Sequence, residues 1–245
     1  KAIYRSSNVY FYDVASRLDI DYLARFAAAF GFGQNLALDI SDASHGLVPD
    51  PEWKLGAKGE KWYQGDSVNM GIGQGDLLVT PLQIATYAAM IANRGRVVRP
   101  RMVMARDELG NPAAQPSMPE KKLNLTEQDW QNMVASMEDV VHLGGQGFRA
   151  NGTAWAYIGQ RIGYRMAGKS GTAQVVEIRQ GEEYDEEELS EFSRKHAWFM
   201  AFAPVEDPQI ALAVLVENGG GGSSVAGPVA REIIDSYLGR SVAVR

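Results

Sequence analysis

The fold is decided by Tyr164-Arg-Met-Ala-Gly-Lys-Ser-Gly-Thr-Ala-Gln-Val-Val-Glu-Ile178, whose composition predicts a β-strand. Strand alternation places Lys169 and Gly171 on one face, and Ser170 and Thr172 on the other. Because Gly171 has no Cβ, another chain can approach the backbone closely there. Backbone N–H groups beside two hydroxyls and an ammonium group suit a carboxylate and a developing oxyanion. This stretch therefore predicts a polar binding site along a strand.

The same residues allow a nucleotide-binding alternative. Residues 163–170 match the phosphate-loop pattern G-x-x-x-x-G-K-[ST]. That motif needs a buried strand before Gly163 and a helix after Ser170. The preceding residues are interrupted by a glycine and two polar residues, and the following residues are typical of a strand. The context disfavours a phosphate-loop nucleotide hydrolase, and a helix after Ser170 would support one.

Capping signals and apolar periodicity place the other elements. Thr80-Pro81 predicts a helix start and Gly95 its end, while Thr126 and Asp129 form a capping box. We expect a loop-rich segment over 31–69 and turns over 107–119. The predicted helices cover 9–18, 21–30, 80–95, 126–141 and 228–238, and the predicted strands 97–105, 165–178, 197–204 and 209–217.

The order of these elements predicts the fold class. Asp207-Pro208 makes a turn between the last two strands, so neighbouring strands are expected to run antiparallel. The apolar face of the 126–141 helix can cover such a sheet. The expected fold is α+β, an antiparallel sheet covered by helices in one domain. That apolar face consists of Trp130, Met133, Val134, Met137, Val140 and Val141.

Composition excludes several classes of function. The 245 residues are 45% hydrophobic and carry a net charge of −6, which argues against a nucleic-acid surface. The longest apolar runs, at 197–203 and 210–216, are too short to cross a bilayer. The absence of cysteine excludes disulfides and thiolate metal sites. The carboxylates at 182–191 are expected to form a solvated face or, less readily, a partner surface.

The histidines and nearby carboxylates do not predict a metal site. Asp39, Asp42 and His45 are close in sequence, but their spacing matches no recognised metal motif. His142 and His196 are expected to be structural or surface residues. We therefore predict no metal and no cofactor.

A second motif lies at the start of the chain, in Ser6-Ser7-Asn8. An S-x-N motif followed by K-S-G-T resembles the signature set of penicillin-binding proteins. The chain resembles the class B penicillin-binding proteins, which are peptidoglycan transpeptidases. The insertion at 177–196 is similar to that of elongation-type penicillin-binding protein 2. Other similar segments lie at 71–85, 92–95, 152–154, 196–204 and 219–230.

The resemblance implies catalytic roles for three residues. Ser6 would relay a proton between a catalytic lysine and the leaving amine. Asn8 would hydrogen-bond the substrate peptide and orient that lysine. Lys169 would raise the positive potential and so favour the deprotonated base. From the residues alone, Ser6 and Asn8 could instead cap a helix that begins at Val9.

The resemblance also implies a binding site for substrate or β-lactam at Ser170, Gly171 and Thr172. The two hydroxyls would hold the terminal carboxylate of the substrate. The backbone N–H of Thr172 would form half of the oxyanion hole. The glycines at 71, 73 and 75 are expected to form a tight loop without a ligand.

One family motif is missing from this sequence. The family carries its nucleophile in S-x-x-K, and none of the eight lysines has a serine three residues before it. The resemblance places this tetrad upstream of S-x-N. We therefore expect residues 1–245 to be the C-terminal portion of one transpeptidase domain with the serine β-lactamase-like fold, incomplete at its N-terminus. The S-x-x-K segment, pedestal and membrane anchor would be absent, and this chain alone would be inactive.

The function implied for the intact protein is D,D-transpeptidation of stem peptides ending in D-Ala-D-Ala, through an acyl-serine intermediate. β-Lactams would acylate the same serine. The implied partners are the lipid II polymerase and scaffold proteins of the elongation complex, on the periplasmic side of the bacterial inner membrane. The alternatives are a D,D-carboxypeptidase or penicillin sensor of the same fold, the nucleotide hydrolase, and a non-catalytic scaffold.

Overall fold

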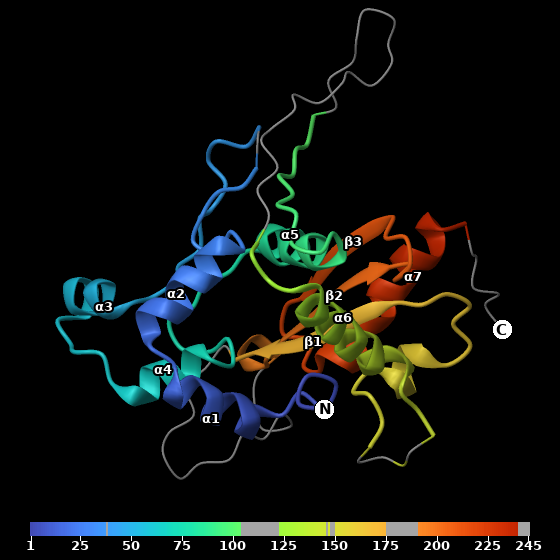
Figure 1. The fold of residues 1–245 in the computed structure, drawn as a ribbon, viewed down its shortest axis with the longest axis horizontal. Coiled ribbons are helices and arrows are strands. Elements are labelled where there is room, and N and C mark those ends of the chain that lie inside the picture. Colours follow the sequence, from blue (N-terminus) through green and yellow to red (C-terminus); the bar gives the residue numbers. More distant parts are fainter. Residues whose placement is uncertain (38, 104–122, 146, 148–149, 175–190, 240–245) are drawn as a thin grey trace, which may run out of the picture.

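The computed structural model describes residues 1–37, 39–103, 123–145, 147, 150–174 and 191–239. Within them, three antiparallel strands form one sheet in the order β1-β2-β3 (Figure 1). The strands are β1 (Ala167–Ala173), β2 (His196–Ala203) and β3 (Ile210–Val216). The α-helices are α1 (Asn8–Arg17), α2 (Ile20–Ala29), α3 (Pro51–Lys58), α4 (Gln64–Met70), α5 (Pro81–Ala92), α6 (Glu127–His142) and α7 (Gly227–Tyr237). Short helical turns are η1 (Trp155–Gly159), η2 (Glu191–Ser193) and η3 (Gly222–Ala226).

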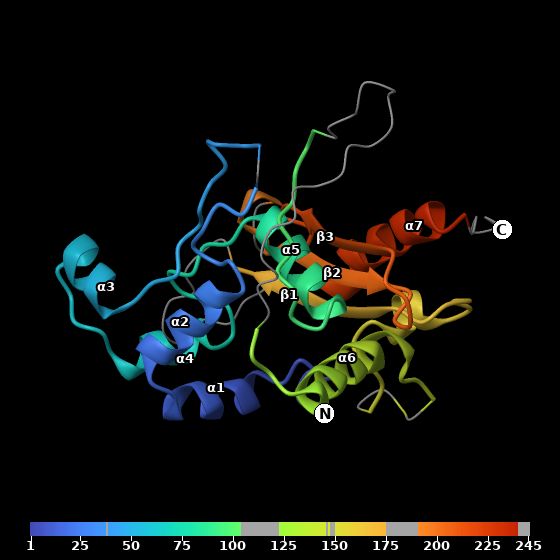
Figure 2. The same ribbon diagram turned by 45° about the horizontal axis from the view of Figure 1, so that its top comes forward.

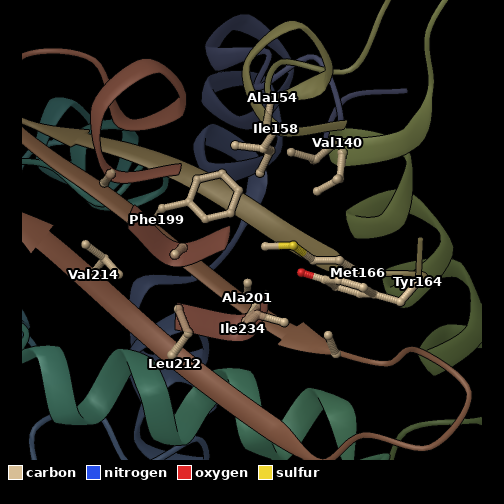
Figure 3. Close-up of a cluster of buried hydrophobic side chains, with 14 of the residues drawn as sticks. Val140, Ala154, Ile158, Tyr164, Met166, Phe199, Ala201, Leu212, Val214 and Ile234 are labelled. Atoms are coloured by element: carbon tan, nitrogen blue, oxygen red, sulfur yellow. The ribbon is translucent and has the colours of Figure 1, made fainter. Parts of the chain in front are cut away.

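The expected α+β architecture is confirmed, with apolar side chains packed on both faces of the sheet. On one face, Phe199 of β2 packs with Val140 of α6 and Ile234 of α7 (Figure 3). On the other, Phe202 of β2 packs with Trp130 of α6 and with residues of α5. Because alternate β2 side chains enter different clusters, β2 is buried on both sides and fixes the sheet between two layers.

Helices α1 to α4 lie to one side of the sheet, where β1 forms an edge (Figures 1 and 2). In that layer, α1 packs closely on α4. A Cβ added at Gly71, which follows α4, would lie 2.3 Å from the Cβ of Ala15 in α1. No helix of the described residues is long and apolar enough to cross a membrane.

The predicted capping signals operate as expected. The Thr80 side chain accepts a hydrogen bond from the Gln83 N–H, and Pro81 occupies the first turn of α5. The Thr126 side chain accepts from the Asp129 N–H at the start of α6. These bonds satisfy backbone donors that a helix leaves free at its N-terminus.

Of two predictions about the middle of the chain, one was wrong and the other was incomplete. The predicted strand over 97–105 does not form in its described part, residues 97–103. Pro100 lacks an N–H, and the N–H groups of Met102 and Val103 donate to the Asp39 carboxylate rather than to a neighbouring strand. The segment over 31–69 is loop-rich as predicted, but it also contains the short helices α3 and α4, the first capped by the Asp50 side chain.

The structure also contradicts the nucleotide-binding alternative. Strand β1 continues through Ser170 to Ala173, where a phosphate loop requires a helix. The β-branched residues after Ser170 favour extended backbone, and β1 pairs with β2 along its whole length. The match of residues 163–170 to the phosphate-loop pattern is therefore coincidental.

The close packing of η3 on the sheet provides a stability test. A Cβ added at Gly222 would lie 2.3 Å from the Gly171 carbonyl oxygen and 2.4 Å from that of Trp198. We expect Gly222→Ala to lower the free energy of unfolding by about 1–3 kcal/mol, because backbone must move to relieve the overlap. Urea denaturation followed by tryptophan fluorescence measures this loss.

The matched control is Gly56→Ala in α3, where an added Cβ meets nothing within 4 Å. Alanine there should raise the free energy of unfolding by roughly 0.5–1 kcal/mol, through lower backbone entropy in the unfolded chain. Equal effects of the two substitutions would contradict the packing of η3 against β1.

Candidate active site

The side chains of Lys169 and Ser6 meet at the edge of the sheet. The Lys169 Nζ donates a hydrogen bond to the Ser6 Oγ at 2.9 Å, and a second to the Ser170 carbonyl oxygen at 2.6 Å. Lys169 and Ser6 are 163 residues apart in sequence. Burial lowers the pKa of Lys169 to about 8, because the ammonium group loses hydration without gaining a carboxylate partner among the described residues. The structure therefore brings together two of the predicted catalytic residues and makes Lys169 easier to deprotonate.

Ser6 is held in an unusual backbone conformation. Its φ is 50°, in the left-handed region, which costs a non-glycine residue about 1–3 kcal/mol. Two turn hydrogen bonds hold this shape, from the Ser6 N–H to the Ile3 carbonyl and from the Ser7 N–H to the Ala2 carbonyl. Helix α1 begins at Asn8 with Ser7 as its N-cap residue. Ser6 is therefore directed at Lys169 and is not the helix cap.

Asn8 occupies the first position of α1 rather than a cap position. Its side chain is exposed. Among the described residues it has no hydrogen-bond partner, so the structure does not join it to Lys169 as it joins Ser6. The amide remains accessible from solvent, two residues after Ser6.

The register of the sheet confirms the predicted alternation along β1. Lys169 is opposite Met200, in the layer of α5 and α6. Ser170 is opposite Phe199, whose side chain enters the cluster beneath α7. Thr172 lies on the same face as Ser170 and is exposed. The hydroxyls of Ser170 and Thr172 make no hydrogen bond within the described chain, so both can bind an anion.

Another segment does approach β1 at Gly171, although the missing Gly171 Cβ is not what makes room for it. That segment is η3, whose Gly222 lies against the Gly171 backbone so closely that a Cβ there would overlap it. Gly171 itself packs over Trp198, with an added Cβ placed 3.2 Å from the Trp198 Cβ. These contacts pin the middle of the Lys-Ser-Gly-Thr segment to the sheet.

The glycine-rich segment after α4 forms a tight loop against the same strand. Gly73 and Gly75 have φ values of 77° and 76°, which favour glycine. Between them, the Gln74 Nε2 donates to the Thr172 carbonyl oxygen at 3.0 Å. Gln74 was not among the predicted site residues, and its only signal in the sequence is its position between two glycines in a family-like segment.

The histidines have the structural roles expected of them. The His142 Nε2 accepts from the Met166 N–H at 3.0 Å, and burial lowers the pKa of His142. The His196 Nδ1 accepts from the Asn218 N–H at 2.9 Å. The Asp39 carboxylate accepts from two backbone N–H groups, which lowers its pKa. No group of three metal-ligating side chains occurs among the described residues.

Comparison with known proteins decides the family. The model of the penicillin binding protein transpeptidase domain matches residues 1–235. The chain belongs to the penicillin-binding protein transpeptidase domain family. It is 39% identical to peptidoglycan D,D-transpeptidase MrdA of Acinetobacter baumannii over 241 residues, 97% of this chain and 34% of that protein.

Two solved structures of proteins named PBP2 share the fold of this transpeptidase domain. Pseudomonas aeruginosa PBP2 in complex with WCK 5153 is 42% identical with a TM-score of 0.80, covering 97% of this chain and 48% of that chain. The complex of PBP2 and MreC from Helicobacter pylori is 31% identical with a TM-score of 0.76, covering 98% of this chain and 40% of that chain. The chain thus spans about a third of the curated relative and less than half of these structures.

The depressed pKa of Lys169 predicts a pH dependence of stability. The pKa is about 8 in the folded protein and 10.5 ordinarily, so between these values the unfolded chain binds more protons. The contribution of Lys169 to the free energy of unfolding therefore rises with pH between these two values. We expect the difference in free energy of unfolding between wild type and Lys169→Met to shift in favour of wild type from pH 8 to pH 10.5.

Urea denaturation of both proteins across this pH range measures the difference, and other titrating groups cancel in the comparison. A difference that is constant with pH, or that shifts in favour of Lys169→Met, would contradict the burial of the Lys169 ammonium group.

Proposed function

We propose that this chain supplies one side of the active site of a peptidoglycan D,D-transpeptidase that cross-links stem peptides during cell-wall elongation. The observation that carries the proposal is the 2.9 Å hydrogen bond from Lys169 to Ser6 beside the edge of β1. Membership of the transpeptidase family and 39% identity to MrdA support it. The proposed activity belongs to the whole protein. In this proposal, the S-x-x-K tetrad lies upstream of Lys1.

In this proposal, the end of the acyl donor binds along β1. The hydroxyls of Ser170 and Thr172 donate hydrogen bonds to the terminal carboxylate of D-Ala-D-Ala, an acceptor to which hydroxyl donors are suited. Gly171 lies between them in sequence but on the opposite face of the strand, over Trp198. The Thr172 N–H and the N–H of the nucleophilic serine bind the developing oxyanion.

The proposed reaction has two steps, acylation of the nucleophilic serine and transfer of the acyl group to an acceptor amine. The lysine of the tetrad takes the serine proton, and the serine oxygen bonds to the penultimate D-alanine carbonyl carbon. The peptide C–N bond then breaks, and Ser6 passes the proton to the departing D-alanine amine. An amine of a neighbouring stem attacks the acyl-serine and regenerates the hydroxyl.

Lys169 and Asn8 assist without forming bonds to the acyl group. The Lys169 ammonium, hydrogen-bonded to Ser6, raises the local positive potential and so favours the neutral form of the tetrad lysine. The exposed Asn8 amide hydrogen-bonds the substrate peptide and orients that lysine. The groups that act as acid, as base and as oxyanion donors are all side-chain or backbone groups of the protein, so the proposed chemistry needs no cofactor.

We further propose that the intact protein acts on the periplasmic side of the inner membrane, in a complex with a lipid II polymerase and scaffold proteins. The structure of PBP2 from Helicobacter pylori in complex with MreC supports a protein partner. A β-lactam mimics the acyl donor and acylates the same serine. A D,D-carboxypeptidase would differ only in using water in place of the acceptor amine.

Intact mass after incubation with a penicillin tests this function in the whole natural polypeptide. We expect wild type to gain the mass of one drug molecule. Lys169→Ala and Ser6→Ala should each slow acylation by about 10²–10⁴-fold, because proton transfer loses a positioned partner. Lys61→Ala, which removes an exposed lysine, is the matched control and should acylate normally.

Absence of any adduct on folded wild type would favour a non-catalytic scaffold. If acylation occurs, chromatography of the products from lipid II-derived glycan separates the remaining alternatives. Cross-linked dimers support transpeptidation, and release of D-alanine without dimers supports a carboxypeptidase.

A further inference from the structure

The loop between α4 and α5 reaches the strand that carries Lys169 through one side chain. The Gln74 Nε2 donates a 3.0 Å hydrogen bond to the carbonyl oxygen of Thr172, 98 residues away. None of the roles proposed above uses Gln74. The residue that accepts this hydrogen bond, Thr172, is the one whose N–H is proposed to bind the oxyanion.

Gln74 is itself held in place by its own loop. Its N–H donates to the Asn69 carbonyl at 2.9 Å, and the Gly73 N–H donates to the Met70 carbonyl at 2.9 Å. Two residues later, Asp76 forms an ion pair with Lys58 of α3 at 2.7 Å. The loop is thus anchored to α4 and to α3, so the Gln74 amide is presented from a supported backbone.

The edge of β1 at Thr172 needs such a restraint. Strand β1 is at the edge of the sheet and ends at Ala173, so part of its backbone lacks a neighbouring strand. The preceding residue is Gly171, which restricts backbone rotation least of all residue types. An oxyanion donor must be oriented before the reaction to be effective. The Gln74 bond adds a contact from outside the sheet to the pairing with β2 on the other side of Thr172.

The direction of the Gln74 bond shows which way Thr172 faces. In an antiparallel strand, the N–H and C=O of one residue point to the same edge. Gln74 lies outside the sheet, so its bond to the Thr172 carbonyl indicates that the Thr172 N–H also faces the open edge. A carbonyl oxygen has two lone pairs, so this bond leaves one acceptor position for a substrate amide.

We propose that Gln74 is a positioning residue that orients the backbone of Thr172, and with it the N–H group that binds the oxyanion. The inference rests on the proposed function of this site. It predicts that loss of the Gln74 donor slows the chemical step more than it weakens substrate binding. A small misplacement of a catalytic group is enough to slow the chemical step, since a shift of about 1 Å costs up to about a hundredfold in rate.

The test compares Gln74→Met with wild type in the whole natural protein, using a penicillin as the probe. Stopped-flow kinetics give the dissociation constant of the non-covalent complex and the rate constant of acylation separately. We expect the acylation rate constant to fall by about ten- to a hundredfold. The dissociation constant should change by less than about threefold, since the Ser170 and Thr172 hydroxyls still bind the carboxylate.

Gln34→Met is the matched control, because the Gln34 Nε2 also donates a 3.0 Å hydrogen bond to a backbone carbonyl, that of Ala28. That bond is local to the end of α2, so acylation should be unchanged. Gln74→Glu keeps the length of the side chain and removes the donor, so it should slow acylation at least as much as Gln74→Met. It also serves as the test variant if Gln74→Met does not fold.

The outcomes separate this inference from the proposed function. If wild type is not acylated, the proposed function fails. If wild type is acylated and the Gln74 variants react equally fast or faster, the positioning role is wrong while the function stands. A variant that lowers the melting temperature and changes both constants equally would show a merely structural role and would also overturn the inference.

Discussion

The hydrogen bond between Lys169 and Ser6 is the interaction on which the candidate site depends. It joins the first turn of the chain to the edge strand of the sheet, and Ser6 adopts a left-handed backbone to make it. Lys169 gives up hydration to reach this position, which lowers its pKa to about 8. A group with this pKa is partly neutral near physiological pH, so small changes in its surroundings shift its charge.

Glycine makes the geometry of the site possible. Phe199 packs so closely beneath Gly168 that an added Cβ would lie 2.8 Å from its ring, and Gly222 lies directly against Gly171. The Lys-Ser-Gly-Thr segment is thus clamped between a buried aromatic ring and the backbone of η3. This clamp rests on β2, the central strand, whose side chains are buried on both faces of the sheet. The polar groups of β1 are therefore presented from a fixed backbone.

Sequence reasoning predicted the elements whose signals are local. The caps at Thr80 and Thr126 predicted α5 and α6, and strand alternation separated Lys169 from Ser170 as observed. It also predicted that the start of the chain and Lys169 belong to one site, through family-like motifs rather than through geometry. The boundaries of the helices and strands follow from short-range patterns, which the chain carries clearly.

The features that sequence reasoning missed depend on distant contacts. Residues 97–103 have strand-like composition, yet the Asp39 carboxylate takes the N–H groups that a strand would need. Helices α3 and α4 have only 8 and 7 residues and gain support from ion pairs such as Lys54 with Asp66. The Gln74 bond spans 98 residues and has no periodic signal. For residues 97–103 and for Gln74, a partner far along the chain decides the local structure, whereas α3 also carries a local cap at Asp50.

The most direct test of this account is a crystal structure of the whole natural protein acylated by a penicillin. The account predicts the drug carboxylate within hydrogen-bond distance of the Ser170 and Thr172 hydroxyls, with the Ser6 hydroxyl still hydrogen-bonded to Lys169. The drug carbonyl oxygen should accept from the Thr172 N–H. A drug bound away from β1, or a Lys169–Ser6 separation beyond about 4 Å, would contradict the central claim.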